Sequence, residues 1–284
     1  MKQDHVLTLS CDDRPGLVAA TTGLLAQLGG NILDAHQFND VESGRFFMRL
    51  AFEIGEATAA DLHAEVGRLA EQHGMDWSLR IANAPKKVAL LVSKFDHCLD
   101  DLLYRHRIGE LNMHVVAIIS NHPRDALNIT PIGETPFHHL PVTPQTKPQQ
   151  EARIKEIVDS SGADLIVLAR YMQILSNDLA AFLSGRCINI HHSFLPGFKG
   201  AKPYHQAHAR GVKMIGATAH YVTAELDEGP IIVQDVEPIT HADSPEDMIR
   251  KGRDIERRVL ARAVRFHLED RVLLNGTKTV VFQD

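Results

Sequence analysis

Runs of uninterrupted apolar residues in the second part of the chain constrain the fold more than any other feature of the sequence. Three such runs, at Val88 to Val92, Val115 to Ile119 and Leu165 to Ala169, are separated by stretches with helical character. Strands of this kind are buried on both faces, which is typical of a parallel sheet covered by helices. We therefore predict a Rossmann-like, mostly parallel α/β domain over residues 88–284, with its binding crevice at the carboxyl ends of the strands.

The end of this domain is predicted to contain one long helix and a last strand. Ser244-Pro245-Glu246-Asp247 combines an N-cap serine, a proline in the first turn and acidic side chains near the positive end of a helix. A helix is therefore expected from there to about Asp270. Asn275-Gly276 predicts a turn into a short strand from Thr279 to Phe282.

Residues 1–82 show alternating apolar residues and two amphipathic stretches in place of long apolar runs. The expected elements are a strand from His5 to Leu9, a helix from Leu17 to Leu28, a strand at Asn31 to Leu33, a strand from Arg45 to Ile54, a helix from about Thr58 to His73 and a strand from Asp76 to Ile81. This β-α-β-β-α-β order predicts a ferredoxin-like α+β domain. The short polar segment 83–87, which contains Pro85, is expected to link the two domains.

Length and composition set the broad class of the protein. The 284 residues exceed the roughly 100 to 200 of a typical domain, which favours two domains. A formal net charge of -6 offers no electrostatic basis for binding a polyanion, so nucleic acid is not an expected partner. No apolar run approaches the roughly 20 residues that span a bilayer, and the N-terminus lacks an apolar signal core. The three scattered cysteines indicate neither a disulfide framework nor a cysteine metal site, so we expect a cytoplasmic protein without a membrane partner.

The densest group of chemically capable side chains lies in the segment Cys187 to Gly200, where a predicted strand runs into a loop rich in Pro and Gly. Asn189 and His191 are two residues apart, so on a strand their side chains share one face and can converge on one carbonyl group. An amide N–H that faces a developing oxyanion and an imidazole that moves protons near neutral pH are common components of acyl transfer. An asparagine that caps a turn beside a structural histidine is the alternative that these residues leave open.

A second chemical candidate is Asp227, in an acidic turn between two predicted strands that follows His220. A carboxylate in that turn could raise the pKa of a neighbouring imidazole and hold its tautomer, as the third member of a base-orienting set does. On these residues alone, an aspartate that only supports its own turn before Gly229 is the better interpretation.

Taken together, the two segments resemble the formyltetrahydrofolate-dependent transformylase family over roughly residues 87–284. The shared motifs are Asn-x-His-x-Ser-x-Leu-Pro at 189–196 and His-x-x-x-x-Glu-Leu-Asp-x-Gly-Pro-x-Ile at 220–232. The resemblance implies catalytic roles for Asn189, His191 and Asp227 and a substrate-binding role for His220. It also implies that Met172 and Leu175, in a loop that begins at Arg170, contact the pterin ring of a folate substrate.

The segment after the first strand of this domain differs from the pattern of some branches of this family. Transformylases that use a phosphoribosyl amine are expected, by resemblance, to carry a glycine-rich phosphate loop after the first strand of this domain. Here that position reads Val92-Ser93-Lys94-Phe95-Asp96-His97-Cys98-Leu99, which contains no glycine and one acidic residue that would repel a phosphate. The chain therefore looks more like the hydrolytic branch, the formyltetrahydrofolate deformylases, in which water replaces the amine.

The first domain resembles an ACT regulatory module through Asp13-Arg14-Pro15-Gly16-Leu17 and Asn31-Ile32. This resemblance implies an amino-acid effector bound near Asp13, Gly16, Leu17 and Asn31, and a homo-oligomer. Together with the catalytic resemblance, it implies an enzyme that hydrolyses 10-formyltetrahydrofolate to tetrahydrofolate and formate, supplying formate for purine synthesis and balancing one-carbon pools.

In the mechanism that we expect, His191 activates a water molecule, Asp227 supports the imidazole, and the Asn189 amide stabilises the oxyanion. No cofactor and no metal are expected. Three alternatives remain: an amine-formylating transferase on the same scaffold, a metal hydrolase that uses His191, His192 and His220, and an amino-acid sensor that has lost its chemistry. Adjacent strand residues point to opposite faces, and the sequence has no helical His-x-x-x-His pair near this segment, which disfavours the metal.

Overall fold

A computed structural model describes residues 2–128, 133–195 and 203–283 of the chain, which divides into two compact units. The first contains Met1–Ala84, Glu269–Asn275 and Val280–Asp284, and the second contains Pro85–Leu268 and Gly276–Thr279. The division after Ala84 falls inside the segment that we predicted as the linker. Residues 196–202, which include the Pro and Gly of the predicted loop, lie outside the described residues.

The end of the chain differs from the prediction that residues 88–284 form one domain, because its last residues join the N-terminal unit in two segments. Hydrogen bonds explain this assignment. Arg49 Nε donates to the Glu269 carbonyl oxygen at 3.1 Å, Arg80 pairs with Asp270, and Asn275 Nδ2 donates to Asp40 at 2.7 Å. Such long-range polar contacts leave no pattern in a local stretch of sequence.

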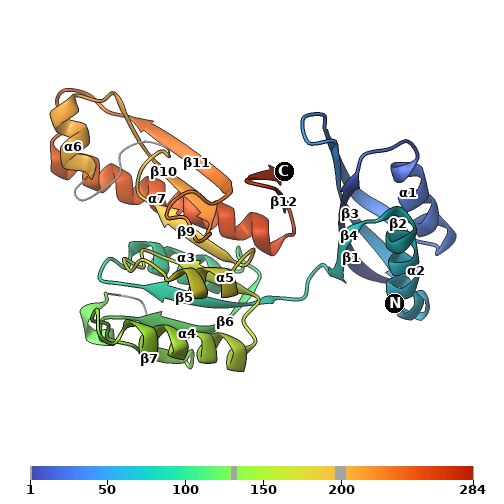
Figure 1. Cartoon of the computed structure of the whole chain (residues 1–284), viewed down its shortest axis with the longest axis horizontal. Coiled ribbons are helices and arrows are strands. Elements are labelled where there is room, and N and C mark those ends of the chain that lie inside the picture. The colour runs from blue at the N-terminus through green and yellow to red at the C-terminus, as the bar shows by residue number, and fades with distance from the viewer. Residues whose placement is uncertain (1, 129–132, 196–202, 284) are drawn as a thin grey trace. The chain divides into compact units, whose positions relative to one another are not determined.

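The N-terminal unit has the predicted ferredoxin-like order (Figure 1). Its elements are β1 (Lys2–Asp12), α1 (Leu17–Gln27), β2 (Asn31–Asp40), β3 (Arg45–Gly55), α2 (Glu56–His73) and β4 (Asp76–Ile81). The antiparallel strands pair in the order β2-β3-β1-β4. The two helices pack against each other, and Leu25 and Leu62 enter one core with the inner residues Leu7 and Phe52 of the strands.

The second unit is built on a seven-stranded sheet in the order β11-β10-β9-β8-β5-β6-β7. Its strands are β5 (Lys86–Val92), β6 (Met113–Ser120), β7 (Phe137–His139), β8 (Leu165–Leu168), β9 (Cys187–His191), β10 (Met214–Tyr221) and β11 (Ile231–Pro238). All neighbours from β9 to β7 are parallel, whereas β10 is antiparallel to both β9 and β11. The predicted mostly parallel sheet is therefore confirmed.

Helices cover both faces of this sheet, as the apolar runs predicted (Figure 1). The helices are α3 (His97–Arg107), α4 (Lys147–Ser161), α5 (Asn177–Phe182), α6 (Pro203–Arg210) and α7 (Pro245–Leu268), with a 3₁₀ turn at Arg124–Ala126. On one face, α4 and α5 form a core with alternate strand residues such as Leu91, Ile119 and Ile166. The other alternate residues face α3 and α7, which pack together.

The remaining strands, β12 (Val272–Asn275) and β13 (Lys278–Val281), form a two-stranded sheet of which only the second strand was predicted.

Cys11, Cys98 and Cys187 are free and buried. Among the described residues, no helix is both long enough and apolar enough to span a membrane.

Candidate active site

The predicted catalytic side chains come from the carboxyl end of β9 and from the turn after β10. Because β9 is parallel to β8, its last residues lie at the edge of the sheet where we expected the binding crevice. Asn189 and His191 lie two residues apart on β9 and share one face of the strand. Antiparallel pairing with β10 places His220 directly opposite Asn189. The two sequence motifs therefore meet at one site.

Asp227 faces His191 in this site, with its Oδ2 3.3 Å from His191 Nδ1. Burial by itself raises the pKa of Asp227, but hydrogen bonds and charge interactions with His191 and His220 outweigh it and hold the pKa well below its ordinary value. Asp227 is therefore a carboxylate near neutral pH. It can hold the proton on Nδ1 of His191 and fix the orientation of the ring.

The other ring nitrogen of His191, Nε2, is buried and has no hydrogen-bond partner within the described residues. Buried polar atoms in native proteins are nearly always partnered, so an exception calls for a functional explanation. His191 also borders a cavity. An imidazole anchored through Nδ1 at the wall of a cavity, with Nε2 left without a partner, is suited to act as a general base.

His220 fixes the orientation of the Asn189 amide. Its Nδ1 lies 2.9 Å from the Tyr221 carbonyl oxygen, which can only accept, so Nδ1 carries the proton. When the ring is neutral, Nε2 is then an acceptor and lies 3.3 Å from Asn189 Nδ2; when the ring is protonated, the same nitrogen faces Asp227 Oδ1 at 3.8 Å. One amide hydrogen of Asn189 is thus directed to His220 and the second remains for the cavity. His220 also lines the cavity, so the substrate contact that we predicted stays a prediction beside a positioning role toward Asn189 and Asp227.

Gly229, at the end of the turn that carries Asp227, packs directly against β10. A Cβ at this position would lie 1.7 Å from the Tyr221 carbonyl oxygen. We expect Gly229→Ala to displace the turn, to lower the free energy of unfolding by about 1 to 3 kcal/mol and to slow turnover as Asp227 moves away from His191. Denaturant titration and steady-state kinetics measure the two effects. Gly23→Ala is the matched control, because a Cβ there meets nothing within 4 Å; equal stability of the two variants would contradict the expected clash.

Asn189, His191 and Asp227 border one cavity of about 330 Å³. Much of its wall is apolar, supplied by Met172, Ile174, Leu175, Val222 and Leu226. The structure thus brings Met172 and Leu175 to the same cavity as the three polar side chains. An apolar wall with a few convergent polar groups is typical of a small-molecule binding site.

The loop after β5 is closed by its own hydrogen bonds. Ser93 Oγ lies 2.6 Å from Asn121 Oδ1 and accepts a hydrogen bond from the Met172 backbone N–H at 2.9 Å. The Asp96 carboxylate accepts from the backbone N–H of Asn128. At the position that a glycine-rich phosphate loop would occupy, this chain therefore has an acidic side chain and a serine whose hydroxyl is engaged in hydrogen bonds. Both features disfavour a phosphorylated substrate there.

A buried ion-pair network beside the cavity was not predicted from the sequence. Arg170 lines the cavity, and its Nε lies 3.4 Å from Oε2 of Glu256, a residue that is 1% exposed. His97 Nε2 and the Tyr204 hydroxyl meet the same carboxylate at 2.8 and 2.9 Å. Of this network, the sequence could have indicated only Arg170, because it begins the loop of the family motif. The other three side chains come from separate helices, and no sequence spacing relates them.

His97, Cys98 and Glu256 are the one group in the described part of the chain whose potential metal-ligand atoms lie within 4.8 Å of one another. Glu256 already accepts from Tyr204 and pairs with Arg170. A metal ion at this place would have to compete with a neighbouring guanidinium for the same carboxylate. The donor set therefore fits a satisfied buried acid better than a metal site.

In the N-terminal unit, a cavity of about 380 Å³ brings together three of the four residues predicted to bind an effector, namely Asp13, Gly16 and Leu17. Asn31 does not line it. The Asn31 side chain instead donates to Glu53 at 3.2 Å, at the start of β2. Asn39 lines the cavity in its place and donates to Asp13 at 2.8 Å.

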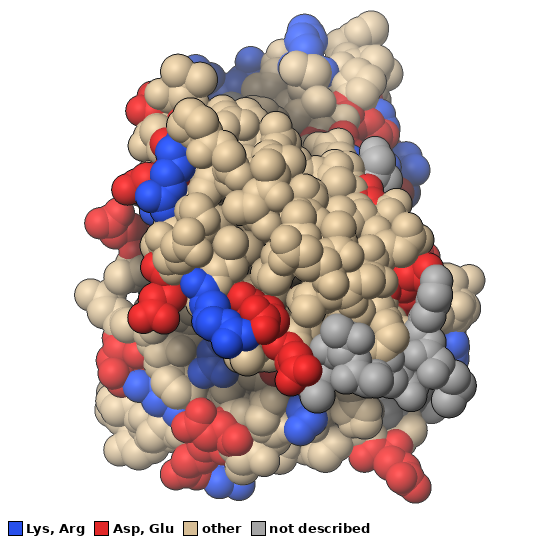
Figure 2. Space-filling model, turned by 90° about the vertical axis from the view of Figure 1, so that its right-hand side faces the viewer, with Lys and Arg blue, Asp and Glu red and all other residues tan. Residues whose placement is uncertain are grey.

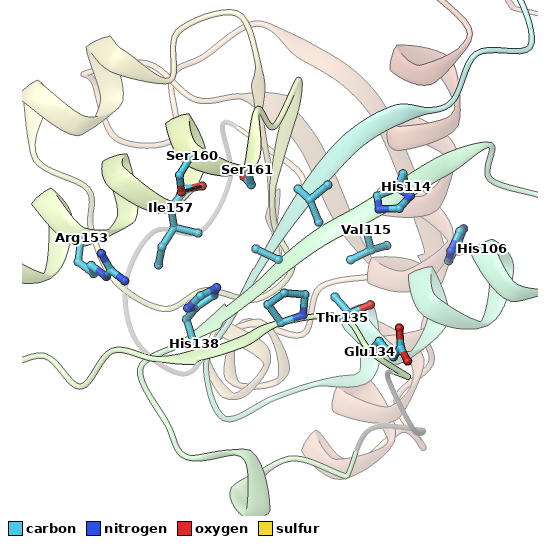
Figure 3. Close-up of a pocket in the computed structure, with 13 residues that line it drawn as sticks. His106, His114, Val115, Glu134, Thr135, His138, Arg153, Ile157, Ser160 and Ser161 are labelled. Carbon is cyan, nitrogen blue, oxygen red and sulfur yellow. Dashed lines mark hydrogen bonds between the residues drawn. The ribbon is translucent and has the colours of Figure 1, made fainter.

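A larger cavity, of about 670 Å³, lies at the opposite end of the parallel strands (Figure 3). His114, His138 and Arg153 surround it, and it reaches the amino-terminal half of β6. Burial, followed by the charge of Arg153, lowers the pKa of His138. None of the residues predicted to act on substrate lines this cavity, so it is separate from the candidate active site.

Comparison with known proteins gives matches over both units. A formyl transferase family model matches residues 86–264, and an ACT domain model matches residues 5–68. The chain is 50% identical to a formyltetrahydrofolate deformylase of Corynebacterium sp. (strain P-1), with 98% of each chain covered. A crystal structure of formyltetrahydrofolate deformylase from Burkholderia mallei superposes with a TM-score of 0.92 at 50% identity, covering 99% of this chain and 100% of that chain. Glycinamide ribonucleotide transformylase 1 from Symbiobacterium toebii is more distant, with a TM-score of 0.63, 29% identity and coverage of 72% and 98%.

A helix-covered parallel sheet that presents an asparagine, a histidine and an aspartate beside an apolar cavity, joined to an ACT domain, defines a folate-dependent formyl transferase class of protein. Within that class, the chain belongs to the formyltetrahydrofolate deformylase family, which it matches from end to end. The predicted family and fold class are thereby confirmed.

Proposed function

We propose that the protein hydrolyses 10-formyltetrahydrofolate to tetrahydrofolate and formate. One observation carries this proposal: the Asn189 amide and the His191–Asp227 pair converge on a cavity whose apolar wall suits a pterin ring. The names of the matched relatives support the same substrate. Formate produced in this way would supply purine synthesis and balance the pools of one-carbon carriers.

The arrangement suggests how each side chain acts. His191 Nε2 takes a proton from water as the water oxygen attacks the formyl carbon, and Asp227 stabilises the resulting imidazolium. The Asn189 N–H donates to the oxyanion that forms on the formyl oxygen. When the C–N bond breaks, the imidazolium returns the proton to the folate nitrogen. Met172 and Leu175 hold the ring in place.

The competing activity is formyl transfer to an amine on the same scaffold. The closed, acidic loop after β5 supports hydrolysis, because it offers no backbone cradle for a phosphorylated amine. The deciding experiment measures formate released from 10-formyltetrahydrofolate by the purified protein, with and without glycinamide ribonucleotide. Hydrolysis predicts the same rate of formate release in both mixtures. Release that requires the amine, with formylated amine as product, would establish transfer.

We also propose that the reaction needs neither a metal nor an organic cofactor, since the imidazole and amide supply proton transfer and oxyanion stabilisation. Treatment with EDTA or 1,10-phenanthroline, followed by gel filtration into metal-free buffer, is expected to leave the turnover rate within about twofold of the untreated enzyme. A zinc-dependent hydrolase assayed in parallel controls for the efficacy of chelation. Loss of activity that returns with zinc or iron would replace the imidazole mechanism with a metal-assisted one.

The cavity of the N-terminal unit is proposed to bind an amino-acid effector. Gly16 precedes α1 and provides no side-chain cap, so the first backbone N–H groups of the helix are available to a carboxylate, while Asp13 suits an ammonium group. We expect one or more amino acids, with glycine and methionine the first to test, to change the turnover of the full-length enzyme. Asp13→Asn should abolish that response and keep the basal rate. An unaltered response would place the effector site elsewhere.

We propose that the chain is a homo-oligomer and that the N-terminal unit contributes to its interface. β2 is an edge strand, and Leu33 and Phe38 on it are 56% and 45% exposed. Helix α1 contains no charged residue, and Figure 2 shows a broad surface area without Lys, Arg, Asp or Glu. Light scattering coupled to gel filtration should give a mass that is a multiple of 31.5 kDa. Leu33→Asp should lower the measured mass, because it places a charge in the proposed interface. A monomer at all concentrations would refute this.

A cytoplasmic location is proposed on the state of the cysteines. Cys11, Cys98 and Cys187 are free thiols, as a reducing compartment would keep them. Cell fractionation followed by immunodetection tests this location directly.

A further inference from the structure

The backbone at Arg170 is held in a conformation that favours glycine. Its φ is 65°, in the left-handed region that few side chains other than glycine, asparagine and aspartate adopt readily. Hydrogen bonds from the Ser93 backbone to the Arg170 carbonyl oxygen, and from Met172 to the Ser93 hydroxyl, pin the segment on both sides. An arginine at a position where glycine would be less strained indicates that its side chain is needed there.

The guanidinium group of Arg170 is buried but only partly satisfied. The side chain is 10% exposed, and neither Nε nor Nη1 has a hydrogen-bond partner within the described residues. The one other buried side-chain atom of this kind in the described part of the chain is His191 Nε2. All three atoms belong to residues that line the same cavity. Within the described residues, buried side-chain polar atoms without a hydrogen-bond partner therefore belong only to residues that line this cavity.

The carboxylates near Arg170 are also engaged with other donors, so they neutralise its positive charge only in part. Glu256, the nearest carboxylate, is 3.4 Å from Nε and also accepts from His97 and Tyr204, so its charge is shared among three donors. Asp227 is paired with His191. Burial, with the charges of Arg170 and His191, lowers the pKa of His192 to about 4, so this neighbour is neutral near pH 7. Arg170 itself is permanently charged.

We propose that Arg170 forms a carboxylate-binding subsite of the active site, which receives formate as it is produced. The inference rests on the proposed hydrolysis. Water adds to the formyl carbon, the C–N bond breaks with a proton transferred to the folate nitrogen, and the carbon leaves as formic acid, which loses its remaining proton to become formate. The neutral formyl group thus becomes an anion inside a buried pocket. The guanidinium matches the charge of that product: its Nη1 has no hydrogen-bond partner within the described residues, and its Nε makes only a 3.4 Å contact with Glu256.

Formate binding by the full-length protein tests the subsite directly. ¹³C-formate titrated at constant ionic strength and followed by NMR line broadening gives a dissociation constant, and product inhibition gives a second value. Arg170→Gln is expected to weaken formate binding by about 10-fold or more, the usual scale for hydrogen bonds to a charged group. Arg170→Lys keeps the charge but loses the planar fork, so it should weaken binding less. Arg153→Gln, which removes an arginine from the separate cavity, should leave formate binding unchanged.

Glu256→Gln gives a test with the opposite sign. Removing the shared counter-charge frees the guanidinium, so formate should bind several-fold more tightly than to the wild type. A purely structural role for the Arg170–Glu256 pair predicts no such gain, since breaking a buried pair can only loosen the site. Equal formate affinity in the wild type and Arg170→Gln would overturn the subsite. If the Arg170 variants failed to fold, weaker formate binding in Glu256→Gln than in the wild type would also overturn the subsite.

Failure of the subsite and failure of the proposed function can be told apart. Formate released from 10-formyltetrahydrofolate, together with unchanged formate binding in Arg170→Gln, would keep hydrolysis and reject the subsite. No formate release, together with Arg170-dependent binding of formate, would reject hydrolysis and keep an anion site.

Discussion

Replacing Asp227 with Asn should lower kcat by roughly 10²-fold to 10⁴-fold, the range that positioned acid–base groups contribute, and change the affinity for the folate far less. Asp227 lies 3.3 Å from His191 Nδ1, so its proposed role is to support that imidazole and not to bind the folate. Asparagine keeps the size of the side chain but removes the charge that stabilises the imidazolium. It also tolerates the φ of 59° at this position, so the turn should be retained.

The pH profile separates this electrostatic role from a loss of shape. The pKa of Asp227 lies well below its ordinary value, so the carboxylate stays ionised from about pH 5 to pH 8. Any fall in the wild-type rate in that range must come from another group. The loss in Asp227→Asn should therefore be present across the whole range and not only at its acid end.

Glu228→Gln is the matched control, because it removes the same charge from the next residue of the turn, which is exposed. It should keep close to the wild-type rate. If Asp227→Asn instead bound substrate poorly and turned it over normally, Asp227 would be a substrate contact and the pairing with His191 would be incidental.

The sequence predicted those parts of the site that follow from local periodicity. The two-residue spacing of Asn189 and His191 placed them on one strand face, and uninterrupted apolar runs predicted the buried sheet that supports them. The meeting of Asp227 with His191 came from the family motifs and not from spacing. It depends on the antiparallel register between β9 and β10, a long-range pairing that no local pattern encodes.

Contacts built from distant segments were not predicted, for the same reason. Glu256 lies on the long helix α7 at a position that reads as an ordinary charged residue, yet it is buried against Arg170 and His97. Asn31 was assigned to the effector site by its place in a motif, whereas its side chain reaches Glu53 on the neighbouring strand. Polar residues of this kind show their role only when their partners are known.

Replacing Asn189 with Ala should lower kcat by about 10²-fold to 10³-fold, the usual scale for one lost oxyanion donor in a buried site. The donor acts on charge that develops in the transition state, so kcat and kcat/KM should fall together while KM stays near its wild-type value. Steady-state kinetics over a range of folate concentrations measure both. Unchanged turnover would remove Asn189 from the mechanism, and a rise in KM alone would make it a ground-state contact.

The partner of Asn189 provides a sharper test than a second deletion alone. His220 Nε2 lies 3.3 Å from Asn189 Nδ2, and its tautomer is fixed by the Tyr221 carbonyl oxygen. If His220 acts only by aiming the amide, then His220→Ala should reduce kcat in the wild type and have much less effect in a protein that already carries Asn189→Ala. His220→Gln, which can still accept from the amide, should restore part of the loss. Fully additive effects of the two alanine substitutions would show that His220 acts on the reaction independently of Asn189, through Asp227 at 3.8 Å or as a direct substrate contact.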